Sequence, residues 1–173
     1  MPINETLSQY SDWSFESAFA IYVLAFVLLI AQYASARATA VQEKELVGSG
    51  GPVAREGVPG RVVETPKRPL SERLSGMGFA LLILGLVLHI ASVVLRGFAT
   101  ERFPLGNMYE FVLVCALAAG AAYLAFLSRR PVRAFGVWIV AIVLLALGLA
   151  VTVLYTPAGD LVPVLDSYWL VIH

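Results

Sequence analysis

The chain has 173 residues, of which 59% are hydrophobic and only 14% are charged, and its mean hydropathy is +0.80. Soluble domains carry about 25% charged residues, so this composition indicates a lipid environment. The net charge is zero, with 12 basic and 12 acidic residues, which argues against nucleic acid as a partner because phosphate binding requires a basic surface.

Four apolar segments predict an all-α, polytopic membrane protein with four transmembrane helices. Each segment is close to the ~20 residues that cross ~30 Å of hydrocarbon as a helix. In chain order we expect an outer segment 1–14, a helix 15–34, a cytoplasmic linker 35–75, a helix 76–98, an outer loop 99–109, a helix 110–127, a cytoplasmic loop 128–133, a helix 134–155 and an outer tail 156–173. Residues 1–14 contain no Lys or Arg, so the first helix is not expected to be a cleaved signal peptide.

The positive charges set the predicted orientation. Ten of the 12 Lys and Arg residues lie in segments 35–75 and 128–133, which the positive-inside rule places in the cytoplasm. Both chain ends are then outside, and the protein is expected in the plasma or inner membrane. Aromatic residues typical of the interface fall near the predicted outer surface: Tyr10, Trp13, Tyr109, Tyr155, Tyr168 and Trp169.

Two further expectations concern the linker and the single cysteine. Segment 35–75 contains five Gly and four Pro, which predicts a mostly disordered linker with a short helical extension of the first span. Residues 70–74 are expected to lie along the membrane surface. Cys115 lies in an apolar run and is expected to be a small buried side chain.

The second predicted helix carries polar residues on one face. At 100° per residue, Gly78, Gly85, His89, Ser92 and Arg96 fall within a narrow arc. One interpretation is a site for a flat, partly anionic cofactor, with iron on His89 and carboxylates towards Arg96. A second is a helix-packing face in which His89 is hydrogen-bonded to a neighbour and the glycines allow close approach. A third makes His89 a proton relay.

The predicted outer loop also has two interpretations. Asn107 and Glu110 have the spacing of a capping box at the start of the third helix. Alternatively, Tyr109 and Glu110 line the mouth of a cavity. Arg102 then neutralises an anionic ligand there, or it pairs with Glu101 on the surface.

The outer tail contains helix breakers followed by a new apolar pattern. Pro157, Gly159 and Pro163 interrupt the helix, and Trp169 and His173 share one face of a further segment. Because the sequence stops within that pattern, we expect it to be the N-terminal part of a longer protein. His173 is then either an exposed terminal residue or part of a site.

Three local patterns together resemble the cytochrome c biogenesis membrane proteins of the System II type, the CcsA/ResC family, which is called CcsB in some bacteria. Residues 88–92 resemble the family's transmembrane histidine segment. Residues 104–110, which contain Pro104, Asn107, Tyr109 and Glu110, are similar to its Pro-Leu-x-Asn-x-Tyr-Glu loop. Residues 167–173 resemble the segment that ends in its first external histidine. The resemblance covers residues 76–173 well, and 1–75 only through the first span.

The resemblance implies a role in handling haem b at the outer face for covalent attachment to apocytochrome c. His89 would be the intramembrane ligand of the haem iron and His173 one of two external ligands, with Arg96, Ser92 and Gly85 beside the haem. A ResB-type protein would be the partner. The family's tryptophan-rich WWD segment and second external histidine do not occur in this sequence, so we expect it to be inactive alone as a synthase.

Two other functions compete with this interpretation. A transporter or channel fragment would use His89 in a proton or substrate path, but the first and fourth helices have few polar groups at their centres. A respiratory b-type cytochrome subunit would need facing histidines, and only one histidine is expected inside the membrane.

Overall fold

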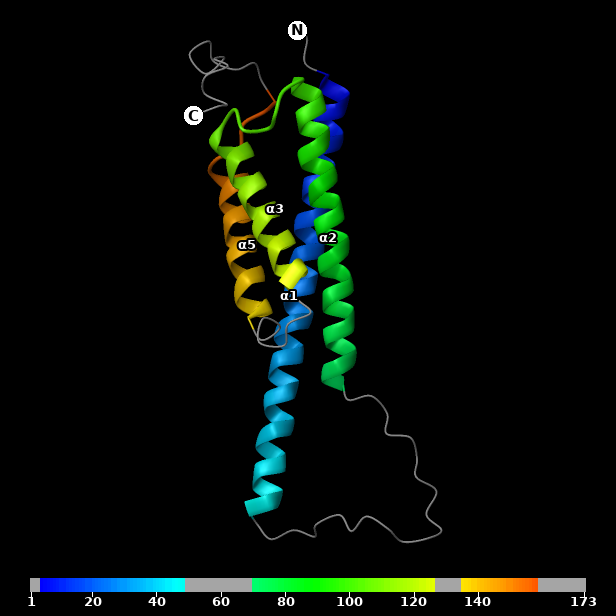
Figure 1. Cartoon of the computed structure of the whole chain (residues 1–173), viewed down its shortest axis with the longest axis vertical. Coiled ribbons are helices and arrows are strands. Elements are labelled where there is room, and N and C mark those ends of the chain that lie inside the picture. The colour runs from blue at the N-terminus through cyan, green and yellow to red at the C-terminus, as the bar shows by residue number, and fades with distance from the viewer. Residues whose placement is uncertain (1–3, 49–69, 127–134, 159–173) are drawn as a thin grey trace, which may run out of the picture.

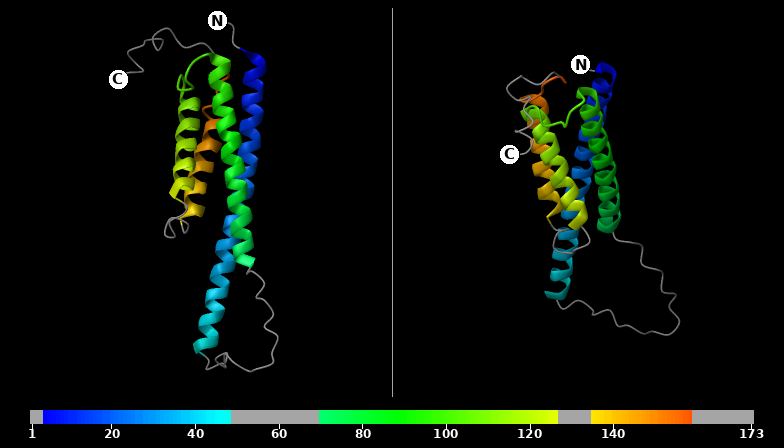
Figure 2. Two further views of the ribbon diagram at one scale, coloured as in Figure 1. Left: turned by 45° about the vertical axis from the view of Figure 1, so that its right-hand side comes forward. Right: turned by 45° about the horizontal axis from the view of Figure 1, so that its top comes forward.

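The computed structural model describes residues 4–48, 70–126 and 135–158, and all regular elements in these ranges are α-helices. The four helices are α1 (Glu5–Gly48), α2 (Leu70–Thr100), α3 (Met108–Phe126) and α5 (Gly136–Thr152), and they alternate in direction (Figure 1). In both views of Figure 2, α1 lies along α2, and α3 lies along α5. The start of α1 and the end of α5 lie at the same end of the bundle. We call this end, where α2 stops and α3 starts, the Arg96 end.

The helices have the properties of membrane spans. α1, α2 and α3 are each long and apolar enough to cross a membrane, and α5 is a shorter apolar helix of 17 residues. At 1.5 Å per residue α5 is about 25 Å long, near the lower limit for a span. The expected all-α fold class is confirmed, and the protein is a multi-pass membrane protein. Which end faces outward stays a prediction from the positive charges.

The first two helices are longer than the predicted spans. α1 has 44 residues, or about 66 Å, more than the thickness of a bilayer. Residues 38–47 contain neither Gly nor Pro, so nothing in them stops the helix before Gly48. The predicted linker is therefore helical at its start. Residues 70–75 continue α2 directly, so the expected separate surface segment is not found. Residues 49–69 lie outside the described residues, and their disorder stays a prediction.

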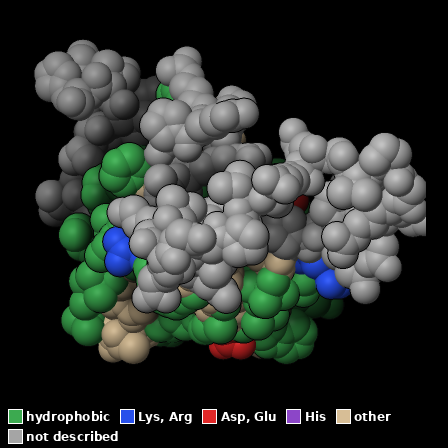
Figure 3. Space-filling model, turned by 90° about the horizontal axis from the view of Figure 1, so that it is seen from below, with side chains coloured by type: hydrophobic (Ala, Val, Ile, Leu, Met, Phe, Trp, Pro, Cys, Tyr) green, Lys and Arg blue, Asp and Glu red, His purple; other side chains and the backbone are tan. Residues whose placement is uncertain are grey.

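Figure 3 views the bundle from the end opposite the Arg96 end. Basic side chains appear there at the edge of a surface that is otherwise mostly hydrophobic among the described residues. Acidic side chains are visible there too, so the view shows a mostly hydrophobic, lipid-facing bundle with charges of both signs.

A regular seam joins α1 to α2. The buried residues of each helix recur at alternating intervals of four and three, which is the spacing of a coiled coil. They are Ser11, Phe15, Ala18, Tyr22, Ala25 and Leu29 in α1, and Gly78, Leu82, Gly85, His89, Ser92, Arg96 and Ala99 in α2. Small and large residues alternate within each set. Small residues let membrane helices approach closely, so the large side chains of one helix lie on the small residues of the other.

Two glycines show how close this seam is. A Cβ atom at Gly85 would lie 2.9 Å from two ring carbons of Tyr22, and one at Gly78 would lie 3.1 Å from Cδ2 of Leu29. The glycines of the α2 face therefore provide contact surfaces for side chains of α1, as the packing interpretation predicts.

The expectation for Cys115 is wrong, because this side chain is exposed on α3. In a membrane protein an apolar run does not imply burial within the protein. Lipid covers the outward face of a helix, just as neighbouring helices cover its inward face.

Candidate functional site

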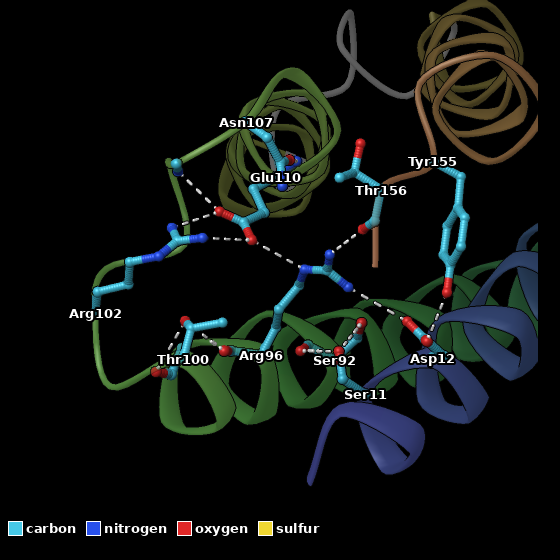
Figure 4. A network of polar contacts seen from close by, with 12 residues as sticks. Ser11, Asp12, Ser92, Arg96, Thr100, Arg102, Asn107, Glu110, Tyr155 and Thr156 are labelled. Atoms are coloured by element: carbon cyan, nitrogen blue, oxygen red, sulfur yellow. Dashed lines mark hydrogen bonds and ion pairs between the residues drawn. The ribbon is translucent and has the colours of Figure 1, made fainter. Parts of the chain in front are cut away.

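Arg96 lies near the end of α2, and its guanidinium is the centre of a buried polar network (Figure 4). Its Nε donates to Glu110 Oε1 over 3.1 Å, its Nη1 donates to Asp12 Oδ1 over 3.4 Å, and its Nη2 donates to the carbonyl of Thr156. The guanidinium carbon also lies 4.7 Å from the centre of the Tyr109 ring, a cation–π contact. These partners belong to α1, α3 and the segment after α5, so this one side chain connects all four helices.

Glu110 is the main acceptor of this network. Its Oε2 accepts from Arg102 Nη1 and from the backbone N–H of Gly106, both over 2.8 Å, and its Oε1 accepts from Arg96. Asn107 caps α3 as expected, because its Oδ1 accepts from the Glu110 N–H over 2.8 Å. The reciprocal half of the capping box is not formed. Two arginines and a nearer N–H bind the carboxylate instead, and charge-assisted hydrogen bonds are the stronger ones.

The loop between α2 and α3 positions the Arg102 side chain beside Glu110. Glu101 has a φ of 50°, and the N–H of Arg102 donates to the carbonyl of Gly97 over 3.2 Å, the arrangement of a Schellman motif. A Cβ atom at Gly106 would overlap the Arg102 guanidinium, so a side chain at this position would displace the guanidinium from its present place. Pro104 is buried against Gly97. The alternative in which Arg102 pairs with Glu101 on the surface is thus not found among the described residues, where Arg102 pairs with the buried Glu110.

The network continues to α1. The hydroxyl of Tyr155 donates to Asp12 Oδ2 over 3.0 Å, so that Asp12 joins Arg96 to the segment after α5. One turn deeper, the Ser11 hydroxyl donates to the carbonyl of Ser92 over 2.8 Å and lies 3.4 Å from the Ser92 hydroxyl. Ser92 is therefore buried in the seam between α1 and α2.

His89 lies two turns below Arg96 on the same face and has a different environment. It is 0% exposed, with ring centroids of Phe15 and Tyr22 at 6.5 and 6.0 Å. The imidazole has a backbone hydrogen-bonding contact with Leu113 of α3, although neither ring nitrogen makes a hydrogen bond of standard geometry among the described residues. The hydrogen bond to a neighbour expected from the packing interpretation is thus present only as this weak contact. A buried polar group that is poorly paired costs free energy, so a stronger partner for this imidazole is favoured.

Of the residues predicted to bind haem, His89 suits a porphyrin better than the others do. His89 offers a poorly paired imidazole among aromatic rings, which suits an iron ligand. The space beside Gly85 holds the Tyr22 ring, and the donors of Arg96 already have partners. A role for Gly85, Ser92 or Arg96 beside haem stays a prediction, and it would require these side chains to rearrange. His173 and the rest of 159–173 lie outside the described residues.

Two cavities lie at the Arg96 end. One of about 400 Å³ lies between α1, α3 and α5 and is lined by Gln9, Asp12, Trp13, Phe15, Glu16, Tyr109, Val151 and Tyr155. The other, of about 580 Å³, is lined only by the last turns of α2 and the following loop. Tyr109 thus lines a cavity, as one interpretation of the loop predicts, while Glu110 is enclosed in the network. Tyr109 is buried within the bundle, whereas Tyr10, Trp13 and Tyr155 are exposed, and the depth of all four at the membrane interface stays a prediction.

Sequence reasoning missed the α1 side of the site. Asp12, Phe15 and Tyr22 contact Arg96 or His89, but none was a candidate. The interval of 3.5 residues in α1 was the available signal, because it places Phe15 and Tyr22 on one buried face. Among the described residues, no group of three or more His, Cys, Asp or Glu side chains is arranged to hold a metal ion.

The fold and the site define a multi-pass helical membrane protein with a buried ion-pair network above a histidine enclosed by aromatic rings. The chain is similar to the cytochrome c biogenesis protein CcsA of Porphyra purpurea, with 30% identity over 107 residues that cover 58% of this chain and 34% of that protein. The chain thus spans about a third of the length of this curated relative. The resemblance found in the local motifs is confirmed by this similarity. No protein-family model matches the chain, and no solved structure matches it.

Proposed function

We propose that this chain takes part in cytochrome c biogenesis and binds haem b inside the membrane through His89, for delivery at the outer face and covalent attachment to apocytochrome c. The similarity to a cytochrome c biogenesis protein supports the process. The observation that carries the site is the fully buried imidazole, which makes no hydrogen bond of standard geometry among the described residues and has only the Leu113 backbone as a weak partner. Haem is the substrate in this proposal, and its iron supplies a stronger partner for the imidazole.

The position of His89 suits a hydrophobic substrate. It lies 11 residues before the end of α2, or about 16 Å below the Arg96 end. The rings of Phe15 and Tyr22 offer apolar surface to a flat macrocycle and keep water from the iron. The role of this chain is then to position and shield the haem, while the ion pairs of Arg96 and Arg102 hold α1, α2 and α3 together above it.

The wider assembly belongs to the same proposal. His173 would bind iron at the outer face, and a ResB-type protein and apocytochrome c would be the partners, as the resemblance implies. With both chain ends outside, residues after α5 are on the side where apocytochrome c is modified. These parts depend on the orientation predicted from the positive charges.

The test is the absorption spectrum of the purified chain, alone and with its ResB-type partner. Replacing His89 by Ala should remove most of the bound haem, and adding imidazole should restore the spectrum by occupying the space that the side chain leaves. This rescue separates an iron ligand from a packing residue, because free imidazole does not repair general misfolding. Unchanged haem content and spectrum in His89→Ala would reject His89 as the ligand. The same variant, assayed for solute flux, tests the alternative of a transporter or channel.

A further inference from the structure

We infer that the cavity between α1 and α5 is the lateral entrance through which a porphyrin reaches His89, with the Phe15 side chain as the wall that moves. This inference rests on the proposed function, because it names the route to the same site. It concerns residues that neither the motifs nor the resemblance singled out, namely Phe15, Trp13, Glu16 and Val151.

The first step is the enclosure of His89. Because this side chain is 0% exposed, a ligand can contact it only after a neighbouring side chain moves. Two aromatic rings lie against it, those of Phe15 and Tyr22. Tyr22 is fixed on the far side by close contact with Gly85, and its hydroxyl lies near Gly120 of α3. Phe15 differs, because it also lines the cavity of about 400 Å³. Of the two rings, Phe15 is thus the one with open space behind it.

The second step is the chemistry of the cavity. Its volume falls within the range of about 300–1,000 Å³ that is typical of small-molecule sites. Four aromatic side chains line it, those of Trp13, Phe15, Tyr109 and Tyr155, and such rings favour flat apolar ligands. Trp13 and Tyr155 are exposed, so the cavity opens to the surface of the bundle. Gln9, Asp12 and Glu16 also line the cavity, so the aromatic side of the opening, next to the wall of the histidine site, is the part that suits the flat face of a porphyrin.

The third step is the charge at the opening. Asp12 is held by Arg96 and Tyr155, whereas Glu16 is exposed at the edge of the cavity. The negative charge of Glu16 opposes the carboxylate edge of a porphyrin, so the ring is expected to enter with its apolar edge first. The charge should then slow the entry of haem without contacting the iron.

The other cavity provides the comparison. It is larger, about 580 Å³, but all its lining residues belong to α2 and the following loop. It therefore lies on the outward side of α2, while His89 faces the seam with α1. A bulky residue placed there changes the surface of the same helix bundle without narrowing the proposed route. Val94 in that cavity is a matched control for Val151 in the entrance.

The experiment follows the binding of haemin to the full chain in detergent by stopped-flow absorbance. Val151→Trp should slow loading about tenfold, because it fills the entrance, while Val94→Trp should stay within about twofold of the wild type. The final haem content of Val151→Trp should reach the wild-type level, because the ligand is unchanged. Glu16→Gln should speed loading, and this gain should shrink as salt screens the charge, whereas Glu5→Gln should have no effect.

A second design avoids the risk that a tryptophan variant misfolds. The Glu16→Cys variant, made in a Cys115→Ser background, is folded first. The sample is then divided into two equal portions, and the cysteine of one portion is labelled with a bulky maleimide. Slower loading of the labelled portion supports the entrance. Equal rates for both portions, or for Val151→Trp and wild type, would overturn it. If loading depends on His89 but not on these changes, the route is wrong and the proposed function stands. If the wild type binds no haemin, both fail.

Discussion

Two layers of α2, only two turns apart, bury polar side chains completely but satisfy them very differently. At Arg96, each of the three guanidinium nitrogens has a hydrogen-bond partner from α1, α3 or the segment after α5. At His89, neither nitrogen makes a hydrogen bond of standard geometry among the described residues, the Leu113 backbone is a weak partner, and aromatic rings lie against the imidazole. Buried polar groups in proteins are nearly always paired. The contrast supports the proposal that Arg96 holds the bundle together and that His89 takes a ligand.

The largest expected effect on stability concerns the layer at Arg96, where the buried polar side chains are paired. Replacing Arg96 by Ala leaves Glu110 and Asp12 without their shared buried partner, and removing one member of a buried ion pair typically costs about 3–5 kcal/mol. The measurement is the unfolding free energy in mixed detergent micelles, followed by circular dichroism. Arg102→Ala is the control, because this partly exposed side chain leaves the Arg96–Glu110 pair in place and should cost less than half as much. Equal losses in both variants would contradict a central role for Arg96.

The next effect tests the seam between the two layers. Gly85→Ala puts a methyl group 2.9 Å from the Tyr22 ring, and overpacking of this kind costs about 1–3 kcal/mol. Gly148→Ala is the matched control, because a Cβ atom there meets nothing within 4 Å and alanine favours a helix. Thermal unfolding should thus shift in opposite directions for the two variants. A stability gain for Gly85→Ala would mean that α1 and α2 are not packed as closely as described.

Removing the polar side chain at His89 should change the unfolding free energy in the opposite direction to removing the one at Arg96. Without haem, His89→Leu should stabilise the bundle by about 1–2 kcal/mol, because it removes a buried polar group that is poorly paired. With haemin added, the wild type should become the more stable protein, since only it binds the ligand. The reversal is measured by unfolding both proteins with and without haemin. Destabilisation of the haem-free variant would show that the imidazole has a strong structural partner.

The smallest effect concerns the loop that delivers Arg102. Glu101 has a φ of 50°, which is unfavourable for residues other than glycine. Glu101→Gly should therefore raise the unfolding free energy by up to about 1 kcal/mol without changing the Arg102–Glu110 pair.

Asn107→Ala should lower the unfolding free energy by about 1 kcal/mol through loss of the α3 cap. Chemical denaturation of the two single variants and the double variant checks both, and the two changes should be additive.

Much of this arrangement follows from local patterns. Helical spacing alone groups Gly85, His89, Ser92 and Arg96 on one face, and all four are buried. The position of Asn107 alone predicts its capping bond. The partners of these residues were harder to predict. Asp12 lies 84 residues from Arg96, and Ser11 lies 81 from Ser92, so no local spacing relates them. The helical extension of the first span was expected to be short, whereas α1 continues to Gly48, the first Gly or Pro residue of the predicted linker.

The sequence by itself determined that the chain is helical and lies in a membrane, and which face of the second helix carries its polar groups. Composition, apolar length and the period of 3.6 residues are enough for that, because lipid leaves the backbone no alternative to internal hydrogen bonds. Only the tertiary structure decided which polar groups are satisfied, that Tyr22 fills the space at Gly85, and that Phe15 separates His89 from a cavity. The physical reason is that lipid is as apolar as the side chains. Hydrophobicity therefore cannot select which faces meet, and close packing and pairing of polar groups make that choice.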